Sequence, residues 1–213
     1  MSESRARILD CACELYLEDG FEGFSMRKVA RSVGVTAPAL YRHYESKEHL
    51  LMDVVGEAHN VLGQYLHTSL EGATPHDRFQ RAGTAYLDFA LDHPRYFQVM
   101  STFAEFMGLD EMPEELAERS CAVQRFWDDR VRECVEAGVL RRDAPEAIGL
   151  TLWSHAFGLI SLYLLGLLSV SEEVFRTLYH DSFERVLCGL GGDLLVERID
   201  ARRSAASDEE VQA

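Results

Sequence analysis

The sequence predicts an all-α protein of about nine helices, with a small three-helix unit at the N-terminus and a larger helical domain after it. Apolar residues recur three and four positions apart along most of the chain, which is the spacing of one helix face. No stretch shows the sustained apolar–polar alternation of a half-buried β-strand. Glycines, prolines and small polar residues stand where these helical patterns begin and end.

Four helices are predicted in the first seventy residues, over residues 4–18, 25–32, 36–43 and 46–70. Ser25, Thr36 and Ser46 stand at the starts of the last three helices, where a side-chain oxygen can accept a hydrogen bond from a free backbone N–H. Gly20 and Gly34 follow the first two helices, because glycine tolerates the left-handed backbone that ends many helices.

Five further helices are predicted in the rest of the chain, and Ser171 can cap the last of them. The other four each have a proline near the start: Pro75, Pro94, Pro113 and Pro145. We therefore divide the chain into an N-terminal domain over residues 1–50, a larger domain over residues 51–196 and a disordered tail over residues 197–213.

Charge is distributed unevenly along the chain. The formal net charge of −15 at first argues against a nucleic-acid partner, because phosphate contacts need Lys and Arg. Residues 25–47, however, hold five basic side chains against Glu45 alone: Arg27, Lys28, Arg31, Arg42 and Lys47. An acidic body with one small basic patch discourages indiscriminate binding to DNA. We therefore expect the functional residues in this patch.

The cysteines do not suggest a cofactor site. Their spacing matches no disulfide framework, and Cys11 and Cys13 would point in different directions on one helix. We expect reduced thiols, no metal and no other cofactor. The chain begins MSESRARILD, which is not an apolar signal segment, so a cytoplasmic protein is expected.

Residues 147–171 carry no formal charge and are long enough to span a bilayer, which takes about 20 residues. The segment contains His155 and lacks basic flanks, since Glu146 precedes it and Glu172 follows it. A helix that is apolar all round also suits the centre of a bundle or a dimer interface. We expect no membrane partner and favour the second interpretation.

The helices predicted over residues 25–32 and 36–43 are joined by a tight turn at Gly34 and Val35. Two short helices connected in this way form a helix-turn-helix motif, whose first helix lies on the DNA backbone while the second enters the major groove. Double-stranded operator DNA is therefore the expected partner.

The residues of the second helix suit such contacts. Its first turn, residues 36–39, is small enough to approach base edges closely. Tyr41, His43 and Lys47 have donors for phosphate oxygens, and Arg42 can contact either a base or a phosphate. The candidate contacts here are Thr36, Ala37, Pro38, Ala39, Tyr41, Arg42, His43 and Lys47.

The preceding helix adds Arg27 and Lys28 as candidates. Together with Arg31 they lie on its outward face, which also fits a solvated helix surface with no partner.

The run from Arg7 to Leu50 resembles the DNA-binding domain of the tetracycline-repressor family. The resemblance rests on Gly20-Phe21, on the segment AxxxGVT over residues 30–36, and on LYRHYESKEHL over residues 40–50. Tyr44 departs from the pattern, in which Phe is usual. The resemblance implies phosphate contacts by Tyr41, His43 and Lys47, and base reading by residues 36–39 with Tyr41 and Arg42.

The same resemblance implies a homodimer whose last two helices form the interface, and a cavity among the middle helices that receives a small molecule. Part of the later chain also resembles a C-terminal domain type of this family, with Leu152-Trp153-Ser154 and Phe157-Gly158. Phe157 stands where that type usually has His, so a role of that His is not transferred.

An effector cavity is expected to be lined by aromatic and Met side chains, which form adaptable apolar cavities. As a group they favour an apolar or aromatic effector over a sugar or a phosphate, although each side chain also suits a plain helix core. The candidates are Phe89, Phe97, Met100, Phe103, Phe106, Met107, Phe126, Trp127, Trp153 and His155.

The resemblance implies a ligand-responsive repressor that leaves a palindromic operator when the effector binds. The ligand would act by preferring the dimer conformation that does not fit DNA. A DNA-binding regulator without an effector is one alternative. An all-α enzyme is another, but no set of residues meets the geometric roles that catalysis requires.

Overall fold

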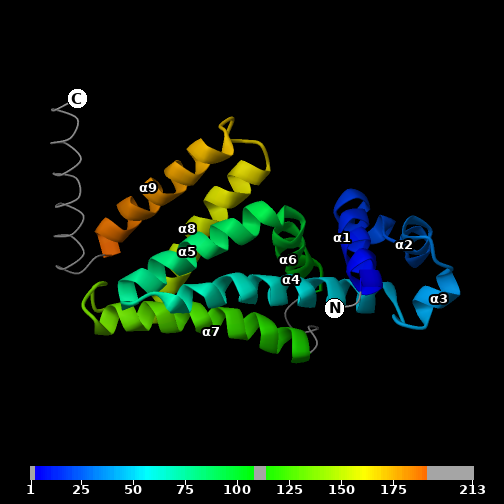
Figure 1. The fold of residues 1–213 in the computed structure, drawn as a ribbon, viewed down its shortest axis with the longest axis horizontal. Coiled ribbons are helices and arrows are strands. Elements are labelled where there is room, and N and C mark those ends of the chain that lie inside the picture. The colour runs from blue at the N-terminus through cyan, green and yellow to red at the C-terminus, as the bar shows by residue number, and fades with distance from the viewer. Residues whose placement is uncertain (1–2, 108–113, 191–213) are drawn as a thin grey trace. The chain divides into compact units, whose positions relative to one another are not determined.

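In the computed structural model, which describes residues 3–107 and 114–190, the chain folds into nine α-helices and one short 3₁₀ turn, Ser69–Glu71 (Figure 1). No strand occurs in these ranges, and the predicted all-α class is confirmed. The helices are α1 (Glu3–Gly23), α2 (Met26–Val33), α3 (Ala37–Tyr41), α4 (Lys47–Thr68), α5 (Pro75–Asp92), α6 (Pro94–Met107), α7 (Glu114–Glu136), α8 (Pro145–Leu164) and α9 (Glu172–Leu190).

The predicted capping residues start the helices as expected. The side-chain oxygens of Ser25 and Thr36 accept hydrogen bonds from the backbone N–H groups of Lys28 and Ala39, at 3.3 and 3.4 Å. Ser46 and Ser171 make the equivalent bonds three residues on, at 3.1 and 3.4 Å. These bonds satisfy backbone donors that have no partner within the helix.

Prolines open α5, α6 and α8, whereas the predicted opening at Pro113 lies outside the described residues. The end of α1 differs from the prediction, because helical residues continue to Gly23. Gly20 nevertheless interrupts the helix, with φ 67° and ψ 177°, which is backbone that only glycine adopts readily. The predicted tail over residues 197–213 also lies outside the described residues.

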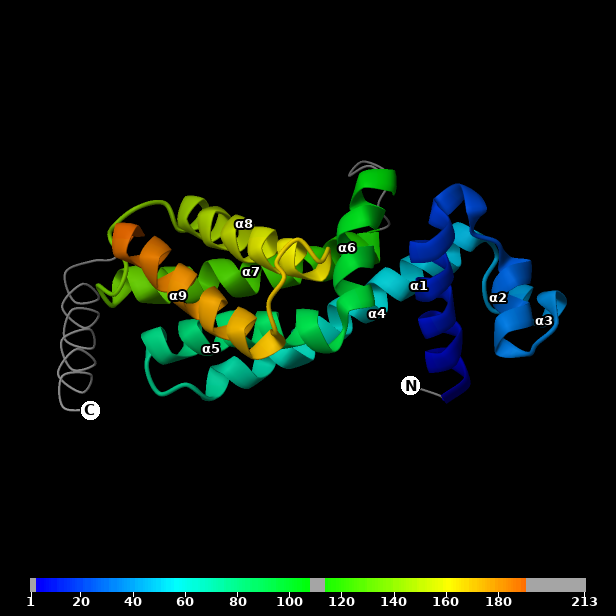
Figure 2. The ribbon, with the colours of Figure 1, turned by 90° about the horizontal axis from the view of Figure 1, so that it is seen from above.

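The chain forms two compact units. The first unit comprises Met1–His67 and Asp88–Val123, and within it α6 packs against α1. Val99 of α6 is fully buried in the same core as Leu9 of α1 and Val29 of α2. Figure 2 shows α2 and α3 beside each other, next to the end of α1. The domain boundary predicted at residue 50 falls inside α4.

The second unit comprises Thr68–Leu87 and the chain from Gln124 onward. Its core joins Phe79, Val131, Ile148, Leu152 and Leu187, one or two residues from each of α5, α7, α8 and α9. Helices α8 and α9 pack against each other, as both ribbon views show (Figures 1 and 2).

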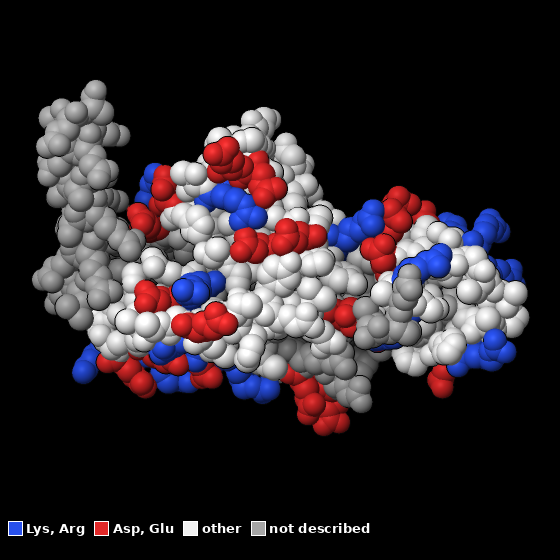
Figure 3. All heavy atoms as spheres, in the orientation of Figure 1, with Lys and Arg blue, Asp and Glu red and all other residues white. Residues whose placement is uncertain are grey.

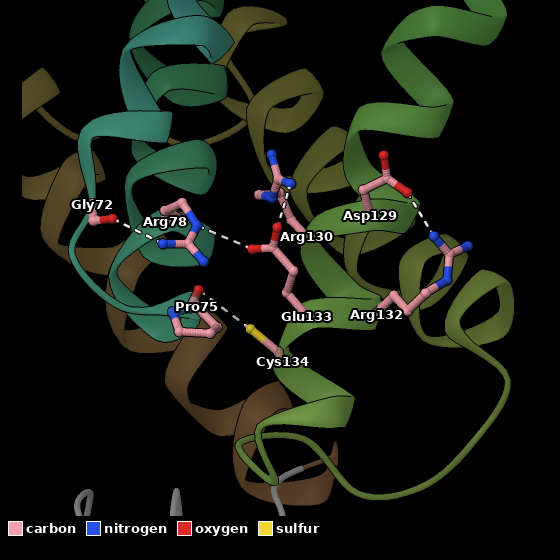
Figure 4. A network of polar contacts seen from close by, with 8 residues as sticks. All are labelled: Gly72, Pro75, Arg78, Asp129, Arg130, Arg132, Glu133 and Cys134. Atoms are coloured by element: carbon pink, nitrogen blue, oxygen red, sulfur yellow. Dashed lines mark hydrogen bonds and ion pairs between the residues drawn. The ribbon is translucent and has the colours of Figure 1, made fainter.

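A polar network connects α5 with α7 in this second unit (Figure 4). Arg78 donates to the Gly72 carbonyl and to the Glu133 carboxylate, both at 3.0 Å. The other Glu133 oxygen accepts from Arg130 at 2.6 Å, and the Arg130 side chain is only 10% exposed. The Cys134 thiol lies 3.5 Å from the Pro75 carbonyl. Glu133 therefore accepts hydrogen bonds from two arginines where α5 and α7 meet.

Candidate DNA-contacting surface and cavity

The turn between α2 and α3 has the geometry that a helix-turn-helix motif needs. Gly34 adopts a left-handed conformation (φ 76°, ψ 29°), and the Val35 N–H donates to the Ala30 carbonyl at 2.9 Å. Leu40 of α3 is 1% exposed and packs in the same core as Val29 and Ala30 of α2. The buried faces and the turn together fix the orientation of α3 on α2.

The outer side of α3 leaves the predicted contact residues accessible. Thr36, Pro38, Tyr41, Arg42 and His43 are exposed, and Ala37 and Ala39 are partly buried. Within the described part of the chain, the side chains of Tyr41, Arg42 and His43 make no hydrogen bond or ion pair. Their polar atoms are therefore available to phosphate or base-edge groups. On the face drawn in Figure 3, Lys and Arg side chains occur around the α2–α3 end of the first unit.

Both lysines of the chain are engaged with the end of α1. Lys28 Nζ lies 2.9 Å from an Asp19 carboxylate oxygen and 3.1 Å from the Gly23 carbonyl. Lys47 Nζ donates to the Phe21 carbonyl at 2.9 Å and lies 3.7 Å from the centre of the Phe21 ring. Arg27 is exposed and makes no such contact with any described residue. A phosphate role for Lys47 would therefore coexist with a structural one.

The Tyr44 hydroxyl has a hydrogen-bond partner that the sequence did not predict. Its hydroxyl donates to Asp53 of α4 at 2.9 Å, and the same carboxylate accepts from Arg5 of α1 at 2.6 Å. Burial, together with the bond to Asp53, raises the pKa of Tyr44 to about 12, so the hydroxyl keeps its proton. The only signal in the sequence is that Tyr44 replaces the Phe of the pattern it resembles.

A cavity of about 350 Å³ lies in the second unit, between α5, α7, α8 and α9. Volumes of roughly 300–1,000 Å³ are typical of sites for small organic ligands. Phenylalanine, tyrosine and tryptophan rings line it from all four helices: Phe79, Tyr86, Trp127, Trp153, Tyr179 and Phe183. Leu152, Ala156 and Leu187 add aliphatic surface. The cavity therefore suits a largely apolar ligand.

Two of the predicted effector contacts line this cavity, Trp127 and Trp153. His155 lies outside the lining, where its Nε2 is 3.0 Å from the Ser182 hydroxyl and burial lowers its pKa. Phe126 is also outside the lining, with its ring centre 6.4 Å from that of Trp127.

The other predicted effector contacts lie in the first unit. Phe89 and Phe97 are buried, and Met100 packs against the core that contains α1. The side chains of Phe103, Phe106 and Met107 lie outside the described residues.

Four rings of the cavity were missing from the predicted set: Phe79, Tyr86, Tyr179 and Phe183. Phe79 and Tyr86 are seven residues apart and share a face of α5. This spacing predicts that the two rings point in the same direction, but it does not predict whether they face another helix or a cavity. No group of three or more His, Cys, Asp or Glu side chains suited to a metal occurs in the described ranges.

Helix α8 is long and apolar enough to cross a membrane by length and composition alone. Only 28% of its most apolar 18-residue window is buried within the chain. Part of this apolar surface is therefore open to a partner.

Comparison with known families gives matches to both halves of the chain. The family model described as "Bacterial regulatory proteins, tetR family" matches residues 8–54. The model described as "Tetracyclin repressor-like, C-terminal domain" matches residues 79–189. Together these two segments cover most of the chain.

Individual relatives and a solved structure also match the chain over most of its length. The HTH-type transcriptional regulator UidR of Escherichia coli is 25% identical over 154 residues, which cover 68% of this chain and 73% of UidR. The HTH-type transcriptional repressor KstR2 of Mycolicibacterium smegmatis is 26% identical over 142 residues, covering 65% and 68%. The solved structure of the ketosteroid transcriptional regulator KstR2 of Mycobacterium tuberculosis matches with a TM-score of 0.74 at 17% identity, covering 91% of this chain and 97% of that one.

Proposed function

The chain belongs to the tetR family of bacterial regulatory proteins, and we propose that it represses transcription from a palindromic operator until a small, largely apolar effector binds its second unit. The observation that carries the DNA-binding part is the exposed stretch at the end of α3, where the side chains of Tyr41, Arg42 and His43 make no hydrogen bond or ion pair within the described residues. Repression is inferred from relatives such as KstR2, which is described as a repressor. We assign no catalytic role to any residue.

We propose that the regulator acts as a homodimer in the cytoplasm. Helix α8, the segment that follows it and the first turn of α9 have apolar side chains that are more than half exposed: Leu150, Leu165, Leu167 and Val174. Large apolar surface left exposed in one chain is often covered by a partner in the working protein. A second copy related by a two-fold axis would cover it on both chains at once, and would set two α3 helices about one DNA turn, ~34 Å, apart.

The cavity supplies the proposed effector site. Its aromatic wall and its volume of about 350 Å³ fit a small organic molecule. Such a ligand would release DNA only by binding one dimer conformation more tightly than another, and the shift is limited by that difference in affinity. The effector would therefore favour a conformation in which the two α3 helices no longer match the operator.

The DNA-binding part is tested by selecting bound fragments from genomic DNA and measuring affinity against salt concentration. We expect an enriched site with two inverted half-sites about one turn apart. Arg42→Ala should weaken binding and lower the slope of log affinity against log salt by about one, because about one phosphate contact is lost. Enrichment of no sequence would contradict the proposal.

Arg142→Ala is the matched control. Arg142 is exposed between α7 and α8, so this change removes the same charge away from α3. It should leave the salt slope unchanged. An equal loss in both variants would mean that net charge, and not the α3 surface, governs binding.

A further inference from the structure

One residue that lines the cavity carries a buried hydrogen-bond donor without a partner among the described residues. Trp127 lines the cavity, and its indole Nε1 is buried without a hydrogen-bond partner among the described residues. An indole N–H can only donate. Buried donors in folded proteins nearly always find a partner, and those that do not require an explanation.

Three other residues that line the cavity donate their side-chain hydrogen bonds to groups of the protein. The Trp153 indole donates to the Tyr86 hydroxyl oxygen. The Tyr179 hydroxyl donates to the Gly83 carbonyl at 3.2 Å, and the Thr84 hydroxyl donates to the Gln80 carbonyl at 3.2 Å. Among the described residues that line the cavity, Trp127 is therefore the one whose buried side-chain donor lacks a partner.

The charge of the wall favours a neutral ligand. Among the described residues that line the cavity there is no Lys or Arg, Glu184 adds a carboxylate, and the imidazole of His180 is exposed to solvent. An anionic ligand would lose its hydration without gaining a buried cationic partner, which is costly in an apolar site. Burial raises the pKa of Tyr86, so this hydroxyl also remains neutral.

The aromatic side chains of the wall favour an aromatic ligand. The Tyr86 and Trp127 rings meet edge to face, with centres 6.1 Å apart and planes at 90°. Rings bury much surface and interact best with other rings in offset or edge-to-face geometry. An aromatic or fused-ring ligand can make such contacts with several walls of the cavity at once.

We propose that the Trp127 indole donates a hydrogen bond to the effector, and that the effector is a neutral, flat, aromatic or fused-ring molecule with an acceptor such as a carbonyl oxygen. This inference rests on the proposed function, because it specifies the ligand of the same cavity. It goes further by naming the recognising atom, the ligand charge and the polar group of the ligand.

Three naphthalenes test this assignment: 2-acetylnaphthalene has a neutral acceptor, 2-ethylnaphthalene lacks it, and 2-naphthoate is an anion. Because the chain has only two tryptophans, ¹⁵N-Trp-labelled full-length protein gives two indole N–H signals, which Trp127→Phe assigns. The ketone should move the Trp127 signal downfield. The hydrocarbon should shift it less, since it offers no acceptor.

Calorimetric affinities provide the second measurement. The ketone should bind about tenfold more tightly than the hydrocarbon, because only the ketone satisfies the buried donor. Trp127→Phe should reduce this ratio to about one. Trp153→Phe is the matched control, because it alters a ring of the same wall whose N–H is already bonded, and the ratio should persist in it.

Equal affinities for ketone and hydrocarbon in the wild-type protein, or a ratio unchanged in Trp127→Phe, would overturn the assignment of the donor. Tighter binding of 2-naphthoate would overturn the neutral ligand class, and failure of all three to bind would overturn the flat aromatic class. Operator binding by the same preparation tests the proposed function separately. DNA binding without binding of any naphthalene would refute this inference and leave the DNA-binding role standing.

Discussion

The α3 surface and the cavity of the second unit are built in opposite ways. The predicted DNA contacts from Thr36 to Lys47 lie within twelve consecutive residues, and the bonds that cap α2 and α3 span three residues. The cavity takes its wall from four helices between Phe79 and Leu187. A local run of sequence can therefore specify the first region, whereas the second depends on how distant helices pack.

This difference predicts different responses to substitution. Exposed side chains on α3 contribute little to the folded state, so their removal should change DNA binding before it changes stability. Side chains that join helices of the second unit are partly buried and share partners. Their removal should lower the free energy of unfolding first.

The largest effect is expected at Glu133, which accepts hydrogen bonds from Arg78 and Arg130. Glu133→Gln leaves two arginines without their carboxylate and should lower the free energy of unfolding by about 2 to 4 kcal/mol. Denaturant unfolding measures this loss. Asp129→Asn is the control, because its pair with Arg132 is exposed (Figure 4) and should cost less than about 1 kcal/mol. Equal losses of unfolding free energy in Glu133→Gln and Asp129→Asn would contradict this prediction.

The same network predicts a pH dependence. Burial alone would raise the pKa of Glu133, but hydrogen bonds from Arg130 and Arg78 outweigh burial and hold the pKa below its ordinary value of 4.5. The stabilisation is therefore fully present above pH 4.5 and is lost as pH falls through the lower pKa of the folded state. Glu133→Gln should lack this component when unfolding is measured from pH 6 down to pH 3.

A smaller effect is expected at Gly34 in the turn before α3. Its φ of 76° is left-handed, so Gly34→Ala should cost about 1 to 2 kcal/mol. Gly63→Ala is the control. A Cβ at Gly63 of α4 also meets no atom within 4 Å, but the helical backbone there suits alanine, which should stabilise by about 0.5 to 1 kcal/mol. Thermal unfolding should show a lower melting temperature for Gly34→Ala and a higher one for Gly63→Ala. A change in the same direction for both variants would contradict this prediction.

The smallest loss of stability is expected at Lys47. Its ammonium donates to the Phe21 carbonyl and lies over the Phe21 ring. Lys47→Met keeps the apolar stem and removes the charge. It should lower the free energy of unfolding by about 1 kcal/mol and should also reduce the salt slope of DNA binding by about one.

Arg42→Ala separates the two roles of Lys47, because the Arg42 side chain makes no hydrogen bond or ion pair within the described residues. It should reduce the slope without lowering stability. Loss of stability in Lys47→Met with an unchanged slope would remove Lys47 from the predicted DNA contacts.

Much of the first unit could be predicted from the sequence. Ser25, Thr36 and Ser46 cap their helices, and Gly34 ends α2, because capping and left-handed backbone depend on neighbouring residues. The contact between Lys47 and Phe21 could not be predicted, because it joins residues 26 positions apart. The bond from Tyr44 to Asp53 likewise depends on how α4 leaves the preceding turn.

Prediction was weaker for the cavity. Phe89 and Phe97 have the aromatic character of a pocket, yet they are buried in the first unit. Trp127 and Trp153 do line the cavity, together with Tyr179 and Phe183 of α9. Helical spacing identifies a buried face, but a ring on that face can meet either another helix or a space.

The helices, their caps, the helix-turn-helix motif and the basic residues around it follow from the sequence alone, because each depends on residues close together in the chain. The folded chain shows in addition that Lys47 is bonded to α1, which rings surround the cavity and which of their indole N–H groups lacks a partner among the described residues. These features depend on packing, because packing brings together side chains from distant helices. The crossing of those helices, and not the spacing of residues within one helix, sets what each side chain contacts.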